Sequence, residues 1–259
     1  MVSAVILTKF IITLITGISG TIAGCSVFHV YIKHRRETSN LGVCDKIQLV
    51  TVLTNLLLQG VMTVHGSFEY FGVYLMLENN MLLLLMFTAQ HVLIVVSFWN
   101  TAWLSIFYSV SLVNVSHQFL HRNKARFISS VPQLVMGSLL WSIVSNIPTF
   151  FTATVENVRN NTDDPFGYII LWNSYDVIIG SLIRFFIPFS MTCLGIGVSV
   201  RSILRHIWRM TQEDSHLTSA QLQGHVRAVR SLVVRFILDI LFFFTTTIIT
   251  VLSPLNYID

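Results

Sequence analysis

Apolar residues gather in six long runs along the chain, and charged residues gather between the runs. The runs cover residues 4–32, 47–64, 81–115, 127–151, 177–204 and 231–251. About 20 apolar residues in a helix, each rising about 1.5 Å, cross about 30 Å of hydrocarbon. Because backbone groups in lipid must hydrogen-bond to one another, each run is predicted to be a helix. The pattern predicts an all-α membrane protein, with residues 1–259 forming a single transmembrane helical domain.

The composition strengthens this prediction. Hydrophobic residues make up 53% of the 259 residues and charged residues only 11%, and the mean hydropathy is +0.70. A soluble domain carries about 25% charged residues. Every motif is therefore expected to lie within or beside a lipid bilayer.

Lysine and arginine lie mostly on one side of the predicted spans. Thirteen of the 16 fall in or beside the first, third and fifth loops, and the other side holds Lys9, Arg159 and Arg184. Short basic loops stay in the cytoplasm, so the N-terminus is predicted to be extracellular. The first span is too long for a signal-peptide core and lacks a preceding basic stretch, which predicts that it stays uncleaved. The pI of about 9.1 reflects this asymmetry, and no nucleic-acid partner is expected.

The predicted outer side offers a glycosylation site but no disulfide. Asn160 begins an Asn-x-Thr sequon, which the topology places in the second outer loop. No pair of cysteines lies outside, since the three are Cys25, Cys44 and Cys193, in spans or on the cytoplasmic side. A six-span chain with its N-terminus outside would also end outside.

The sequence shows no pattern typical of an enzyme or a metal site. His117 and His121 are one helical turn apart, but they lie among basic residues, whose repulsion disfavours a metal ion. No nucleophile elbow, phosphate loop or dinucleotide fingerprint is present. Gly20 and Gly24 have the spacing that lets membrane helices approach closely. The chain is predicted to be a non-enzymatic protein without a cofactor.

Four motifs, in order and on the expected sides of the membrane, carry a resemblance to a known family. They are Leu56-Leu57-Leu58-Gln59, Trp103-Leu104-x-x-Phe107-Tyr108, Pro188-Phe189 with Ser202-Ile203-x-x-His206, and His225-x-x-Ala228-Val229-Arg230. Together they resemble the bitter taste receptors (taste receptor type 2), from about residue 17 to about residue 250. The resemblance implies a seven-helix, G-protein-coupled fold with a ligand pocket near the outer surface. With six spans, the sequence is similar to such a receptor without its seventh helix.

The resemblance also implies which residues of the third span line the pocket. Counting back from Trp99 places Gln90 and Ile94 at pocket positions of the family. Gln90 keeps hydrogen-bonding capacity, and Ile94 makes the pocket more apolar. His91 lies beside them and is either a ligand contact or a hydrogen-bonded packing residue.

Arg184 is a charge inside the fifth span, where insertion costs roughly 2.5–3.5 kcal/mol. One interpretation makes it a ligand or counter-ion contact in the outer pocket. The other makes it a side chain that extends outward to the lipid headgroups, with Asp176 as a nearby partner. Asp176 is also a candidate ligand residue.

Residues near the predicted inner helix ends are candidates for a switch or a G-protein contact. They are Tyr108, Lys124, Arg126, His206, Arg230 and Asp239. The hydroxyl of Tyr108 can equally be an interfacial anchor. Asp239 has i, i+4 spacing to Arg235, so the pair can hold an inactive arrangement or merely shield both charges from lipid.

The expected function is that of a G-protein-coupled chemosensory receptor of the plasma membrane. A small apolar or amphipathic tastant would bind between the third, fifth and sixth helices and shift the populations of two helix arrangements. The basic cytoplasmic loops would then engage a heterotrimeric G protein. Two alternatives remain: a six-span channel or carrier, and a truncated receptor that does not signal. A carrier should show internal repeats, and none relates residues 1–120 to 121–259.

Overall fold

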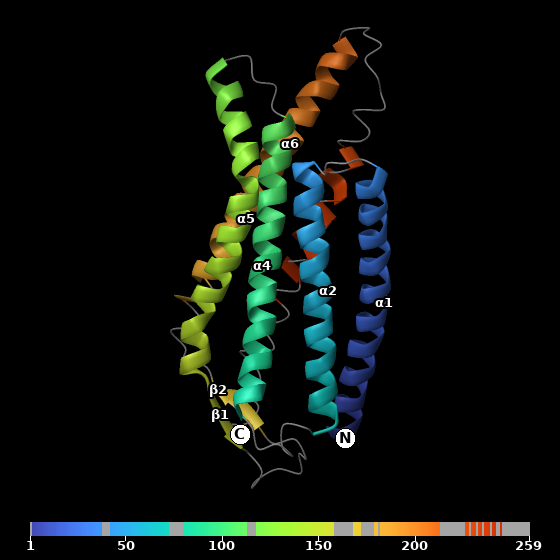
Figure 1. Ribbon diagram of the computed structural model, residues 1–259, viewed down its shortest axis with the longest axis vertical. Coiled ribbons are helices and arrows are strands. Elements are labelled where there is room, and N and C mark those ends of the chain that lie inside the picture. Colours follow the sequence, from blue (N-terminus) through green and yellow to red (C-terminus); the bar gives the residue numbers. More distant parts are fainter. Residues whose placement is uncertain are drawn as a thin grey trace. The chain divides into compact units, whose positions relative to one another are not determined.

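The computed structural model describes most of the chain, and five α-helices account for most of the described residues (Figure 1). The described residues are 2–37, 42–72, 80–112, 118–157, 168–171, 179–180, 182–212 and parts of 226–244. The helices are α1 (Val2–Glu37), α2 (Val43–Tyr70), α4 (Asn80–Leu112), α5 (Gln118–Thr152) and α6 (Ile187–Gln212). A π-helical turn, Leu182–Phe186, leads directly into α6.

Five of these helical segments are long and apolar enough to cross a membrane. They are Phe10–Lys33, Val43–Phe68, Met81–Ser111, Ser129–Thr152 and Leu182–Arg205. These segments coincide with five of the six predicted spans, and the all-α membrane fold is confirmed. Most of the sixth predicted span, residues 231–251, lies outside the described residues.

The helices extend beyond the apolar runs that predicted them. Helix α5 begins at Gln118 rather than at residue 127, and α6 continues to Gln212 rather than ending at residue 204. Apolarity marks the hydrocarbon thickness, whereas intrahelical hydrogen bonds continue into the headgroup region and the water. The apolar runs therefore mark the candidate membrane-crossing part of each helix rather than its ends.

One short sheet departs from the expectation of helices alone. Strand β1 (Thr154–Asn157) follows α5, and it pairs in antiparallel fashion with β2 (Tyr168–Leu171). Thr154 lies opposite Leu171, and Asn157 lies opposite Tyr168. Both strands are rich in β-branched residues, which suit a pleated ribbon. At four residues each, they are too short for a periodic signal to reveal them.

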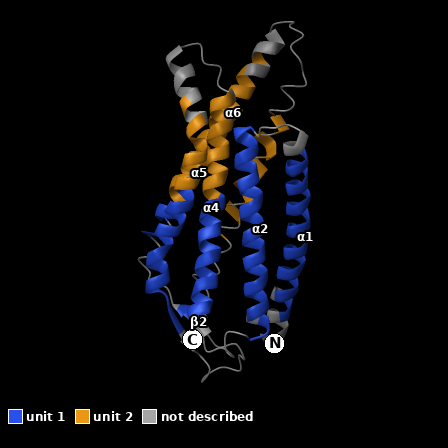
Figure 2. Ribbon diagram, viewed as in Figure 1, with its two compact units in different colours: residues 1–97, 138–184 blue, residues 98–137, 185–259 orange. Residues whose placement is uncertain are grey.

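The chain forms two compact units, which Figure 2 colours separately. The first consists of residues 1–97 and 138–184, and the second consists of residues 98–137 and 185–259. The boundary falls within α4 and α5 and, at its third crossing, just after Arg184.

Helices α1 and α2 pack along a seam of small residues in the first unit. A Cβ atom at Gly24 would lie 2.6 Å from Cδ2 of Leu56, and one at Gly17 would lie 2.5 Å from Oγ1 of Thr63. These glycines therefore allow the α2 side chains to touch the α1 backbone. The prediction that Gly24 lets the first helix approach a neighbour is confirmed, and the neighbour is α2.

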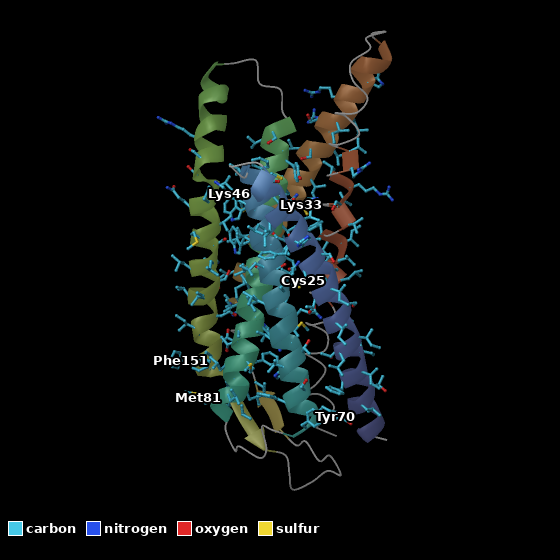
Figure 3. All side chains as sticks on the ribbon, turned by 45° about the vertical axis from the view of Figure 1, so that its right-hand side comes forward. Cys25, Lys33, Lys46, Tyr70, Met81 and Phe151 are labelled. Atoms are coloured by element: carbon cyan, nitrogen blue, oxygen red, sulfur yellow. The ribbon has the colours of Figure 1, made fainter. Side chains whose placement is uncertain are left out.

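The ends of the helices in the first unit alternate as a hairpin arrangement requires. Figure 3 shows Lys33 of α1 and Lys46 of α2 at one end of the unit. Tyr70, Met81 and Phe151 lie at the other end. The end of α1 and the start of α2 therefore lie at the opposite end of this unit from the end of α2, the start of α4 and the end of α5.

Candidate functional site

The predicted pocket residues of α4 lie in the first unit, at the edge of a fully enclosed stretch of helix. Gln90 and His91 are half-buried, whereas Ile94 is only 7% exposed. Residues 94–97 are all buried, and four consecutive residues cover every side of a helix. The α4 helix is therefore surrounded at Ile94 and opens one turn earlier, at Gln90.

His91 belongs to an aromatic column that joins α4 to α2. Its ring stacks on Phe87, with centroids 5.0 Å apart and planes inclined by 29°. Phe87 in turn meets His65 of α2 edge-on, with centroids 6.0 Å apart. Such offset and edge contacts stabilise aromatic pairs beyond simple burial. The column holds the side of α4 that carries His91 against α2, and a ligand contact of His91 itself stays a prediction.

A second contact between α2 and α4 lies further along α4 in the same unit. The hydroxyl of Ser97 donates to Oδ1 of Asn55 at 3.4 Å. Hydrogen bonds between membrane helices stabilise association by about 0.6–2 kcal/mol. The aromatic column and this bond hold α4 in register with α2.

Arg184 is buried against α5 in the first unit, with 5% of its surface exposed. Its Nη1 donates to Oγ1 of Thr149 at 2.6 Å, to Oδ1 of Asn146 at 3.1 Å and to the carbonyl of Ser145 at 3.3 Å. Its Nε donates to the carbonyl of Gly180 at 3.0 Å. The guanidinium is thus held by neutral oxygens of α5 and of its own segment, and its charge is solvated by their dipoles.

The acceptors on α5 form part of a polar stripe on one helix face. Ser138, Ser142, Asn146 and Thr149 are all buried, and they follow one another at spacings of three or four residues. Asn146 donates its Nδ2 to the carbonyl of Ser142 at 2.7 Å, which leaves Oδ1 directed at Arg184. Helical spacing places all four on one side of α5. The regular recurrence of Ser, Asn and Thr within an apolar run was the sequence signal that could have revealed this stripe.

The guanidinium of Arg184 turns toward α5 rather than outward to the lipid headgroups. Its candidate partner Asp176 lies outside the described residues, as does the sequon residue Asn160. Contact between Arg184 and a ligand stays a prediction. The geometry gives this arginine a role in joining the entry of α6 to α5.

Three of the predicted inner residues have described side chains, all in the second unit. Tyr108 is half-buried, and its ring meets Phe107 edge-on with centroids 6.1 Å apart. Arg126 and Arg230 are exposed. The side chains of Lys124 and His206, and the whole of Asp239, lie outside the described part of the structure. The role of these six residues in a switch or a G-protein contact therefore stays a prediction.

Helices α4 and α6 approach most closely at Gly195 in the second unit. A Cβ atom at Gly195 would lie 2.7 Å from Oγ and 2.8 Å from the carbonyl carbon of Ser105. Ser105 is fully buried, and its hydroxyl donates to the carbonyl of Ala102 at 2.8 Å. Only glycine fits a position where another backbone comes this close. This contact was not foreseen from the sequence.

Among the residues that the structure describes, no group of three or more His, Cys, Asp or Glu side chains could hold a metal ion. The polar groups that converge in the first unit are instead the guanidinium, amide and hydroxyl groups around Arg184. Such groups bind and orient, and they do not supply a nucleophile with an adjacent base.

Comparison with known proteins places these features in a family. The family model described as Taste receptor protein (TAS2R) matches residues 1–257. Taste receptor type 2 member 41 of Pan paniscus is 30% identical over 164 residues, which cover 61% of this chain and 53% of the relative. Taste receptor type 2 member 143 of Rattus norvegicus is 29% identical over 154 residues, which cover 56% and 51%. The chain spans about half the length of the curated relatives it matches.

The match to the family model covers nearly all residues and includes every motif on which the sequence resemblance rested. Those motifs lie on α2, α4 and α6 and just before the last predicted span. All five candidate membrane spans also lie within the matched residues. The protein therefore belongs to the taste receptor type 2 family, the bitter taste receptors.

Proposed function

We propose that the protein is a G-protein-coupled chemosensory receptor of the plasma membrane, with its N-terminus outside the cell. It binds a small apolar or amphipathic molecule in a pocket near the outer surface. The observation that carries this proposal is the match to the taste receptor family over residues 1–257, and Gln90 is a half-buried amide one turn before the enclosed Ile94 of α4. One amide on a largely apolar stretch of helix suits an amphipathic ligand, because few polar contacts orient it and burial supplies affinity.

The same proposal assigns signalling to the opposite ends of the helices. The exposed Arg126 and Arg230, with the half-buried Tyr108, offer basic and aromatic contacts to a heterotrimeric G protein. Lys124, His206 and Asp239 complete this proposed set. A ligand that binds one helix arrangement more tightly shifts the population toward it, and the inner ends then change their exposure. A channel or carrier is not favoured, because family membership supports a receptor.

Replacing Gln90 with alanine is expected to raise the half-maximal agonist concentration by about 3- to 10-fold, the loss of one hydrogen bond. The matched control is Leu85→Ala, because Leu85 lies on the same helix with its side chain largely exposed. A panel of bitter compounds is applied to cells that lack related receptors, and calcium release is measured. Surface expression is quantified for each variant.

If the chain is such a receptor, cells that express it respond to the panel of bitter compounds and mock-transfected cells do not. Equal potency for the parent and Gln90→Ala would remove Gln90 from the pocket. A complete lack of response to the panel at full surface expression, while a relative responds in parallel, would contradict the proposed function.

The proposed topology predicts a glycan on Asn160. Asn160→Gln should abolish the mass shift caused by an endoglycosidase, whereas Asn114→Gln should leave it intact. Asn114 also begins a sequon, but the topology places it at the cytoplasmic end of its span. The opposite outcome, a glycan lost with Asn114, would reverse the assigned orientation.

A further inference from the structure

Helix α6 has two faces with different surroundings in the second unit. One face is buried and carries mostly small side chains. It consists of Thr192, Gly195, Ser199 and Ile203. The opposite face is exposed, and consists of Leu194, Val198, Arg201, Arg205 and Trp208. Steps of three and four residues keep each set on its own side of the helix. The exposed set changes from aliphatic to basic to aromatic along a single line.

The aliphatic part of this line marks contact with lipid tails. Leu194 is 70% exposed and lies within the candidate membrane span Leu182–Arg205. Arg201 lies seven residues further along, which is about 10 Å at the rise of an α-helix. The same face therefore passes from hydrocarbon to headgroup depth at the two arginines. Long arginine side chains at such a boundary place their guanidinium groups among phosphates.

Trp208 extends this line beyond the arginines. Its side chain is 71% exposed, although indole is a large apolar surface with a single hydrogen-bond donor. Tryptophan is enriched where the bilayer meets water, because its ring can lie among headgroups. Its place on the same face as Arg205 indicates that this side of α6 stays in the interfacial layer. Continuity with the lipid-facing Leu194 favours lipid over a soluble protein as the occupant.

We propose that Arg201, Arg205 and Trp208 bind the phosphorylated headgroup of an anionic phospholipid in the cytoplasmic leaflet. The guanidinium groups pair with phosphate oxygens, and the indole packs against the glycerol and upper acyl region. These three residues are not among those proposed for the tastant pocket or for G-protein contact. It requires only the proposed orientation of the chain, which the Asn160 experiment tests independently.

The proposal is tested with the full 259-residue chain purified in a zwitterionic detergent. Fluorescent phosphatidylinositol 4,5-bisphosphate is titrated, with phosphatidylcholine carrying the same fluorophore as the neutral lipid. Because each basic residue near an anionic surface contributes about 1 kcal/mol, Arg201→Gln with Arg205→Gln should weaken binding about 30-fold. Arg201→Lys with Arg205→Lys should retain most of the affinity, and Trp208→Ala should reduce it by a smaller factor.

The matched control removes the same amount of charge elsewhere. Lys33→Gln with Lys46→Gln changes two exposed basic residues of α1 and α2 and should alter binding less than about twofold, since neither lies on the α6 face. Size-exclusion profiles and melting temperatures show that each variant is folded. Equal losses in both double variants, or equal affinity for phosphatidylcholine, would overturn the proposal.

Two further outcomes identify other occupants. Soluble inositol trisphosphate that competes as strongly as the lipid would show a free-phosphate site rather than a membrane surface. Unchanged lipid binding combined with lost G-protein activation in the glutamine double variant would assign this face to the G protein. Either result contradicts the lipid assignment.

Discussion

Replacing Gly195 with alanine will destabilise the receptor, whereas the same replacement at Gly197 will not. The new methyl group at Gly195 would lie 2.8 Å from the backbone carbonyl carbon of Ser105, so two helices must separate. Forcing an extra carbon into a packed interface costs about 1–3 kcal/mol. Nothing lies within 4 Å of a Cβ atom at Gly197. There, alanine gains the helix propensity that glycine lacks, about 1 kcal/mol.

The two variants form a matched pair, because both sites lie on α6 and receive the same methyl group. Thermal unfolding in detergent, followed with a thiol-independent dye, should rank Gly197→Ala at or above the parent and Gly195→Ala below it. Surface expression should follow the same order. A Gly195→Ala variant as stable as Gly197→Ala would show that α4 and α6 are not in contact at this point.

Removing the acceptors of Arg184 will destabilise the protein more than removing Arg184 together with them. In Asn146→Leu with Thr149→Val, the guanidinium loses its two side-chain acceptors on α5 while it stays buried. Each hydrogen-bond partner that a buried polar group loses costs about 1–3 kcal/mol, and more when the group is charged. Adding Arg184→Met removes that charge, so the triple variant should regain part of the lost stability.

Melting temperatures of three proteins decide this prediction, in the expected descending order parent, triple variant, double variant. The control is Thr152→Val, since Thr152 is an exposed threonine on the same helix. It should leave the melting temperature unchanged. A triple variant less stable than the double variant would show that the guanidinium does not depend on the α5 stripe.

The hydrophobic pattern was sufficient to predict the five candidate spans of the described residues, because the thickness of the bilayer dictates the length of an apolar helix. It predicted α4 closely, with residues 81–115 against Asn80–Leu112. The family motifs on α2, α4 and α6 also identified the receptor class. Each of these signals is local along the chain or fixed by the membrane.

The contacts around Arg184 and Gly195 depend instead on which helix faces which, and no local pattern contains that information. The spacing of Ser138, Ser142 and Asn146 marks a polar face on α5, but not the partner that it receives. Likewise, Gly195 signals a close approach only once Ser105 is known to lie opposite. The role of Asp176 as a ligand residue and that of Asp239 as a switch residue stay predictions, since both lie outside the described residues.

The polar stripe of α5 also bears on the order in which the chain is assembled during synthesis. The hydroxyl of Ser142 donates to the carbonyl of Ser138, and Asn146 donates to the carbonyl of Ser142, so α5 can enter lipid with these donors already bonded. Arg184 leaves the ribosome later, and its guanidinium donates to Asn146 and Thr149 of this stripe. An α5 helix that is already inserted provides the polar surface that lowers the insertion cost of the next span. The polar stripe of α5 is thus synthesised before the guanidinium that it binds.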